Sequence, residues 1–331
     1  MVKYIIKRLC MSVFILLCVS MIIYFLLRLM PGDFVQDKIT ALQGSGNSVS
    51  QEMIDVMNET YGLGDDSFKG ILKGYTNWVG GLLRFDLGKS FIDNTPVAKK
   101  IVENMGVSFW ISLVATFFEF MIAIPLGITA AIHQYSIRDY IVTILVMIGI
   151  SLPSFFFGNM LKNFFAVQLG WFPTSGIASS TGTSVAFGEM ILDYASHAFL
   201  PVLTIVILSV GARMRMTRTN MLEVMSSDYI RTARAKGLPE KVVINKHAFR
   251  NTLIPLVTSL AGLLPTLFSG AIITEQIFDL PGIGNVALDA MNSGDIPFIM
   301  GYNMFLAILS VLGILLADLM YGIVDPRVKL E

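Results

Sequence analysis

The chain has 331 residues, of which 54% are hydrophobic and 15% charged, and its mean hydropathy is +0.68. A soluble globular domain is about one quarter charged, so this chain has too few charged side chains to cover a water-facing surface. The formal net charge is zero and the charges are unevenly distributed, and we expect no nucleic-acid partner. Cys10 and Cys18 both lie in the first apolar stretch, so no disulfide framework is available. The composition predicts an integral membrane protein.

Six apolar stretches are long enough to cross a hydrocarbon core of about 30 Å, which takes about 20 helical residues. Backbone polar groups find no water in lipid, so each stretch is predicted to be a helix and the fold class to be all-α. The approximate bounds are Leu9–Leu27, Val107–Ile132, Tyr140–Leu161, Tyr194–Ala212, Asn251–Thr274 and Ile296–Ala317.

The first stretch follows three basic residues, as the core of a signal peptide would. It is too long for such a core and lacks a small-residue cleavage site, so we expect residues 1–30 to remain as a transmembrane helix. Residues 31–105 form a long loop in which Gln51–Tyr61 and Phe68–Leu83 are predicted helices. Gly88-Lys89-Ser90 is not a phosphate-binding loop, because position 83 holds Leu where that motif needs Gly.

Polar residues inside the apolar stretches are candidates for a solute pathway. Glu119 lies midway along the second stretch, where a charge costs about 2.5–3.5 kcal/mol unless it faces the bundle or a wet cavity. It is therefore either a structural contact between helices or part of a pathway. Pro153 with Ser154, and Pro265 with Thr266, are further candidates for a hinge or pathway. Lys162 is expected to extend its ammonium group to the outer membrane surface.

The distribution of Lys and Arg predicts the orientation, because short loops rich in these residues stay in the cytoplasm. Basic residues occur at positions 3–8 and 327–329, and nine lie within Arg213–Arg250, whereas residues 163–212 and 251–326 contain none. The pattern predicts six spans with both termini in the cytoplasm. The loop 31–105 faces outward in this scheme, since long loops cross the membrane largely regardless of charge.

Two further outward loops are acidic and contain no Lys or Arg. Their acidic residues are Glu189, Asp193, Asp279, Asp289 and Asp295. Either this composition follows from the orientation rule alone, or the loops form an acidic mouth that favours cationic or amine-bearing solutes.

The cytoplasmic loop 213–250 contains a predicted helix of about two turns. Asp228 is a good N-cap, and Gly237 stands where a helix ends, with Pro239 just beyond it. Such a short helix needs a docking surface to be stable, either anionic lipid or a protein. Its small apolar face of Tyr229, Ile230 and Ala233 suits a groove in a protein partner better than lipid.

This loop resembles the coupling motif of permease subunits of ATP-binding-cassette importers, which reads Glu-Ala-Ala, three residues, then Gly. Aligned on Gly237, the chain reads Arg231-Thr232-Ala233, so only the second Ala and the Gly match. The wider sequence is similar to the dipeptide, oligopeptide and nickel branch of that family, nearly from end to end, and looks like the first of two permeases. The matching segments are 228–238, 247–255, Arg28-Leu-Met-Pro-Gly-Asp33, Asp86-Leu-Gly-Lys-Ser90, Leu169-Gly-Trp-Phe-Pro-Thr-Ser-Gly176, Glu275-Gln-Ile-Phe-Asp-Leu-Pro-Gly-Ile-Gly284 and Asp325-Pro-Arg327.

The resemblance implies a type I importer permease (MetI-like) core at residues 106–324 and a cytoplasmic tail at 325–331. It implies alternating access for peptides, a second homologous permease, two ATP-binding subunits and an extracytoplasmic binding protein. It places the ATPase contact on the coupling helix, at Tyr229, Ile230, Arg231, Ala233, Ala235, Gly237 and Leu238.

Other functions are left open at this stage. The same architecture could carry nickel chelates or short glycans, and a lipid-binding channel or scaffold, or a membrane enzyme, are lesser alternatives. The chain contains no H-E-x-x-H or G-x-S-x-G motif and no Cys/His metal cluster. We therefore expect a non-catalytic subunit without cofactor or metal, with ATP bound by its partners.

Overall fold

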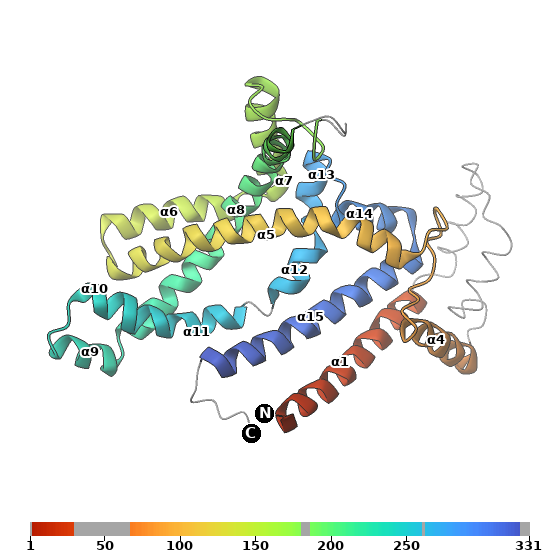
Figure 1. Cartoon of the computed structure of the whole chain (residues 1–331), viewed down its shortest axis with the longest axis horizontal. Helices are drawn as coiled ribbons and strands as arrows, with labels where there is room; N and C mark the ends of the chain where they lie inside the picture. The colour runs from red at the N-terminus through yellow and green to blue at the C-terminus, as the bar shows by residue number, and fades with distance from the viewer. Residues whose placement is uncertain (1, 30–66, 180–185, 260–261, 325–331) are drawn as a thin grey trace. The chain divides into compact units, whose positions relative to one another are not determined.

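The computed structural model describes residues 2–29, 67–179, 186–259 and 262–324 (Figure 1). Within these ranges the chain is helical, and its only β pairing is an isolated bridge between Lys89 and Pro96. The helices are α1 (Val2–Leu29), α4 (Phe68–Leu82), α5 (Val97–Ile132), α6 (Ile137–Ser151), α7 (Ser154–Leu161), η1 (Lys162–Gln168, a π-helix), α8 (Phe187–Met225), α9 (Asp228–Ala235), α10 (Glu240–Val242), η2 (Val243–Ala248, also π), α11 (Phe249–Ser259), α12 (Leu263–Ser269), α13 (Ile272–Phe278), α14 (Ile283–Ser293) and α15 (Ile296–Val324). The predicted helix Gln51–Tyr61 lies outside the described residues.

Among the described residues, four helices are long and apolar enough to span a membrane by themselves. They are Ile6–Leu26 within α1, α5, α8, and Ile296–Asp318 within α15. The predicted third span is a bent pair, because Ile137–Ser151 and Ser154–Gln168 meet at 99°. The predicted fifth span, Asn251–Thr274, is divided among α11, α12 and α13. All-α membrane architecture is thus confirmed, whereas the count of six spans stays a prediction.

The bend between α6 and α7 occurs at Pro153. Leu152 leaves α6 in an extended conformation, and Pro153 is also extended (ψ 133°) before the chain turns helical again at Ser154. Proline disfavours helical geometry in the residue before it and lacks the N–H that would continue the ladder. By contrast, Pro125 and Pro201 lie inside the continuous helices α5 and α8.

The chain divides into two compact units. Unit 1 comprises residues 1–106 and 285–312, and unit 2 comprises residues 107–284 and 313–330, so α5 and α15 contribute to both. In unit 1, α4 packs on α1: the Tyr24 ring stacks on Trp78 at 6.2 Å between centroids, and the Tyr24 hydroxyl donates to the Ile71 carbonyl (3.1 Å). These contacts hold a helix of the predicted outer loop on the first transmembrane helix.

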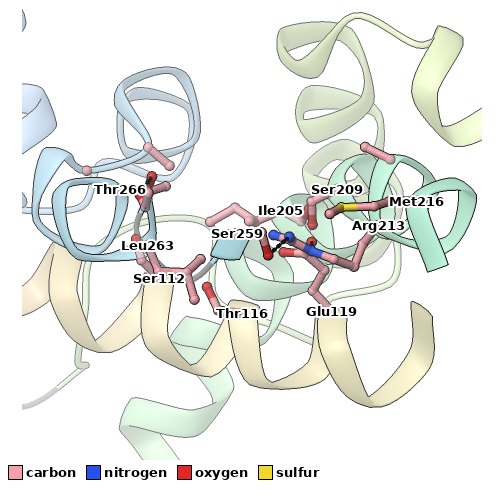
Figure 2. A pocket seen from close by; sticks show the side chains of 14 residues that line it. Ser112, Thr116, Glu119, Ile205, Ser209, Arg213, Met216, Ser259, Leu263 and Thr266 are labelled. Carbon is pink, nitrogen blue, oxygen red and sulfur yellow. Dashed lines mark hydrogen bonds and ion pairs between the residues drawn. The ribbon is translucent and has the colours of Figure 1, made fainter. Parts of the chain in front are cut away.

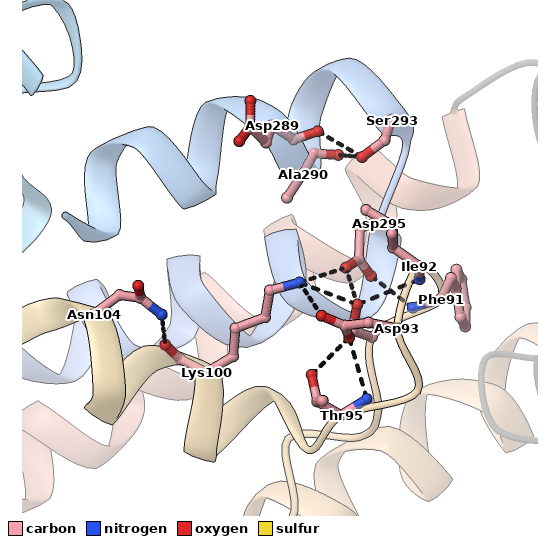
Figure 3. Close-up of polar contacts among 11 residues, drawn as sticks. Phe91, Ile92, Asp93, Thr95, Lys100, Asn104, Asp289, Ala290, Ser293 and Asp295 are labelled. Atoms are coloured by element: carbon pink, nitrogen blue, oxygen red, sulfur yellow. Dashed lines mark hydrogen bonds and ion pairs between the residues drawn. The ribbon is translucent and has the colours of Figure 1, made fainter. Parts of the chain in front are cut away.

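A buried carboxylate organises the loop before α5 in unit 1 (Figure 3). Asp295 is fully buried and accepts hydrogen bonds from Ser90 Oγ (2.5 Å) and Phe91 N–H (3.0 Å), with Lys100 Nζ at 4.0 Å. Lys100 also binds Asp93 at 2.9 Å. Burial opposes ionisation of Asp93, but hydrogen bonds from Thr95 and Lys100 outweigh it and hold its pKa well below the usual range. Asp295 therefore has a cationic partner, and it is not part of an open acidic mouth.

The core of unit 2 forms around α8, which packs against α6, α7, α11 and α13. Glycine permits the close approach of the neighbouring helices. A Cβ at Gly127 of α5 would lie 2.6 Å from Thr217 Cβ, and one at Gly149 of α6 would lie 2.8 Å from the Ile207 carbonyl. Close backbone contact therefore holds α5 and α6 on α8.

A bidentate ion pair fastens the α5–α6 turn to α8. Arg218 donates through Nε and Nη2 to the two carboxylate oxygens of Asp139, at 3.0 and 2.8 Å, and Asp139 also accepts from the Tyr135 N–H. Asp139 is buried, so removing Arg218 would leave an uncompensated charge.

A second buried carboxylate, Glu275 on α13, organises the segment that leads to α14. Glu275 accepts from Ser108 Oγ (2.6 Å) and from the Ala271 N–H (3.2 Å), while Ser108 Oγ accepts from the Ile283 N–H (2.9 Å). Lys162 lies beside the same helix and donates to the Ile277 carbonyl near the C-terminus of α13 (2.5 Å). Lys162 thus has a partner at the C-terminal end of α13, and its position at the membrane surface stays a prediction.

We predict that Gly282→Ala destabilises unit 2 by about 1–3 kcal/mol, the usual cost of overpacking. The new methyl group would lie 2.6 Å from Ser108 Oγ and would collide with the Glu275 carboxylate. Thermal melting of the purified protein checks this. Gly188→Ala is the control, because an added Cβ there meets nothing within 4 Å. Equal melting temperatures of the Gly282→Ala and Gly188→Ala variants would contradict the role assigned to Glu275.

Candidate functional site

A cavity of about 600 Å³ opens in unit 2 between α5, α8 and the α11–α13 segment (Figure 2). Its size falls within the range of small-molecule sites, about 300–1,000 Å³. The lining residues are Ser112, Thr116, Glu119, Ile205, Ser209, Ala212, Arg213, Met216, Ser259, Gly262, Leu263, Thr266, Gly270 and Ala271. Hydroxyl groups and one ion pair thus line a cavity between membrane-spanning helices.

The ion pair joins three helices across the wall of this cavity. Arg213 Nε of α8 donates to Glu119 Oε1 of α5 at 2.9 Å, and Arg213 Nη1 donates to Ser259 Oγ of α11 at 2.8 Å. The guanidinium lies over the Phe120 ring, 4.5 Å from its centroid. The two side chains remain partly accessible, with 16% of Arg213 and 11% of Glu119 exposed.

The sequence-predicted pathway residues fall into two groups. Glu119 and Thr266 both line the cavity, whereas Pro153, Ser154 and Pro265 are absent from its wall. Pro153 and Ser154 instead form the bend between α6 and α7.

Sequence reasoning missed Arg213, because it placed Arg213 in the cytoplasmic loop. In the structure α8 continues to Met225, so Arg213 lies in the interior of a 39-residue helix. The signal that could have revealed the pair is the presence of one acidic residue in an apolar stretch, since a buried charge requires a partner.

The predicted coupling helix exists as α9, Asp228–Ala235, and it is anchored by its apolar face. Ile230 is fully buried and Ala233 is 6% exposed. They pack in a cluster whose other buried members are Ala131 of α5, Met221 of α8, and Val243, Ile244 and Ala248 of η2. The prediction that the whole apolar face meets a partner is corrected here, because Ile230 and Ala233 are covered by the chain itself.

The opposite face of α9 is open. Tyr229 is 46% exposed and Leu238 is 38% exposed. Arg231, Ala235 and Gly237 are also exposed. This face presents an aromatic ring, an aliphatic side chain and a guanidinium group.

The ends of α9 are fixed by local interactions. The N-cap is Ser227, one residue before the predicted Asp228, and Gly237 ends the helix in the left-handed conformation (φ +74°), as predicted. Arg234 binds Glu240 through two hydrogen bonds of 3.2 and 2.7 Å, linking α9 to the start of α10. The hydrogen bonds from Arg234 lower the pKa of Glu240 below its ordinary value, so the link persists at neutral pH.

The cavity and the anchored helix belong to a polytopic membrane protein, and comparison with known proteins identifies the family. Residues 123–330 match the binding-protein-dependent transport system inner membrane component, and residues 1–113 match the N-terminal membrane component of such systems. The chain therefore belongs to the binding-protein-dependent transport system inner membrane components, multi-pass proteins of the cytoplasmic membrane.

Curated relatives align with the chain over its full length. It is 36% identical to the oligopeptide transport system permease protein AppB of Bacillus subtilis, over 99% of this chain and 100% of that protein. It is 33% identical to the dipeptide transport system permease protein DppB of Lactococcus lactis, over 100% of both chains. It is 31% identical to DppB of Escherichia coli K12, over 99% of both chains.

A solved structure shows the same fold. A chain of the methionine ATP-binding-cassette transporter MetNI, in inward-facing conformations, matches with a TM-score of 0.50 and 17% sequence identity. The match covers 68% of this chain and 96% of that chain. It confirms the predicted MetI-like permease fold.

We predict that Ile230→Ala lowers the free energy of local unfolding of α9 by about 2–5 kcal/mol, the usual cost of truncating a buried isoleucine. Hydrogen exchange of the amides of residues 228–237 should become faster. The exposed Thr232, whose hydroxyl bonds only to the Asp228 carbonyl of its own helix, provides the control Thr232→Ala. Unchanged exchange in Ile230→Ala would show that the cluster does not anchor α9.

Proposed function

We propose that the chain is the translocation subunit of an ATP-driven importer of di- or oligopeptides. The observation that carries this proposal is the end-to-end similarity to permeases named for oligopeptide and dipeptide transport. The five hydroxyl side chains and the ion pair in the largely apolar cavity wall support it, because peptides are polar solutes that need hydrogen-bonding partners inside a membrane. The names of the relatives favour peptides over nickel chelates or short glycans.

The chain does not hydrolyse ATP in this proposal. ATP is bound by two partner subunits, and α9 is the element on which they act. Its buried residues Ile230 and Ala233 attach it to the bundle, and its exposed residues Tyr229 and Leu238, with Arg231, Ala235 and Gly237, form the surface for an ATPase groove. A short helix held on one face and open on the other transmits movement as a rigid body.

The path from α9 to the cavity runs along α8. Met221 packs beneath α9, and Arg213 on the cavity wall lies eight residues earlier in the same helix, about 12 Å away at 1.5 Å per residue. Closure of the ATPase pair would therefore displace α8 and change the cavity, which is the event required for alternating access. Glu119 and Thr266 act in the pathway, while Pro153, Ser154 and Pro265 act as bending points.

Membership of the family supports two further partners. A second homologous permease completes the pathway, and an extracytoplasmic binding protein delivers the peptide. Both termini lie in the cytoplasm, as the Lys and Arg distribution predicts. The segment 31–105 faces outward, where α4 offers a platform for the binding protein.

We predict that Ala233→Arg abolishes peptide uptake in the assembled importer, because a charged side chain cannot be accommodated beneath α9. Gly237→Pro should have the same effect, because Pro cannot adopt the positive φ at that position. Uptake by a deletion strain measures the result, with immunoblotting of membranes to show insertion. Ala186→Arg, an exposed position at the N-cap of α8, is the control. Wild-type uptake by both α9 variants would refute the assignment of α9 as the coupling element.

We also predict the sidedness of two exposed serines. In a background with Cys10 and Cys18 replaced, Ser175→Cys should react with a membrane-impermeant maleimide in intact cells, and Ser226→Cys should react only after permeabilisation. The physical reason is that Ser226 ends the helix that leads into the basic loop, while Ser175 lies in a loop without Lys or Arg. The reverse labelling pattern would overturn the orientation.

A further inference from the structure

Two ion pairs join α8 to neighbouring helices, and their geometries differ. Arg218 and Asp139 form a complete bidentate pair, in which both carboxylate oxygens receive a guanidinium N–H. Arg213 gives Glu119 a single hydrogen bond, through Nε to Oε1. Both pairs bind α8 to a neighbouring helix, yet only Arg213 and Glu119 line the cavity.

Among the described residues, Arg213 donates two hydrogen bonds, and its Nη2 group donates none. A guanidinium group has five N–H donors. In Arg213, the Nε–H donates to Glu119, and one N–H of Nη1 donates to Ser259. One face of the group is covered by the Phe120 ring at 4.5 Å. The outer edge formed by Nη1 and Nη2 is the edge that binds a carboxylate through two parallel hydrogen bonds.

The surroundings of that edge suit a ligand more than a further structural contact. Figure 2 shows the Arg213, Glu119 and Ser259 side chains converging, and Thr116 and Ser209 also line this cavity. An arginine that served only to join helices would gain most from complete pairing, as Arg218 does.

We propose that Arg213 binds the terminal carboxylate of the transported peptide through its Nη1–Nη2 edge, and that Glu119 and Ser259 hold the guanidinium in place. This inference rests on the proposed function, since it assigns a binding site to the peptide within that pathway. Glu119 has a second role here. Its negative charge partly offsets that of Arg213, so the carboxylate binds weakly and leaves readily, as a transport pathway requires.

The test is binding of alanyl-alanine and its C-terminal amide to the complete transporter in nanodiscs, without the binding protein, by saturation-transfer NMR titration. The wild type should bind the free acid about tenfold to a hundredfold more tightly than the amide, the effect expected for a charge-assisted pair. Arg213→Gln should bring the affinity for the acid down to that for the amide. Arg218→Gln, the matched control, should keep the preference.

Each of the other outcomes overturns the inference. These are equal binding of acid and amide by the wild type, a preserved preference in Arg213→Gln, equal loss of preference in Arg218→Gln, or no peptide binding at all. The comparison of acid with amide uses the unmodified transporter, so it stands even if Arg213→Gln does not assemble. Uptake of alanyl-alanine by wild-type proteoliposomes with the binding protein tests the proposed function separately. If uptake occurs but the transporter shows no preference for the free acid over the amide in the binding titration, only the proposed site is refuted. If no uptake occurs, the proposed importer function is refuted.

Discussion

The need to pair every buried charge within an apolar bundle governs the arrangement of unit 2. Asp139, Glu119 and Glu275 are all buried. Asp139 pairs with Arg218 and Glu119 with Arg213, while Glu275 accepts from Ser108 of α5 and from the N–H of Ala271, the N-cap of its own helix. In lipid an unpaired carboxylate costs several kcal/mol, so these contacts restrict how the helices can be arranged. Two of these partners lie on α8, which explains why that helix is the centre of the unit.

The position of α8 also relates the two functional regions. One continuous helix carries the arginine of the cavity and the methionine beneath α9. Because no proline interrupts α8 between Arg213 and Met221, a displacement near α9 would in the proposed mechanism reach the cavity. The close contacts at Gly127 and Gly149 extend such a displacement to α5 and α6. The proposed coupling therefore needs one rigid element and its paired charges.

Most of the fold could be predicted because its signals are local. Apolar stretches of about 20 residues mark α1, α5, α8 and α15, and the glycine at 237 marks the end of α9. The contacts that the sequence did not indicate join residues distant in sequence. Lys162 reaches the Ile277 carbonyl, and Asp295 meets Lys100, across separations of 115 and 195 residues. No periodicity or motif records such pairs.

The sequence by itself determined that this is an all-α membrane protein with a short helix in its basic loop, because hydropathy, Lys and Arg distribution and the glycine stop are properties of neighbouring residues. Only the tertiary structure decided which face of α9 is free, because Ile230 is covered by residues of α5, α8 and η2. It also decided that Glu119 shares a cavity with Arg213 and Thr266, because packing brings together residues that lie 94 and 147 positions apart along the chain.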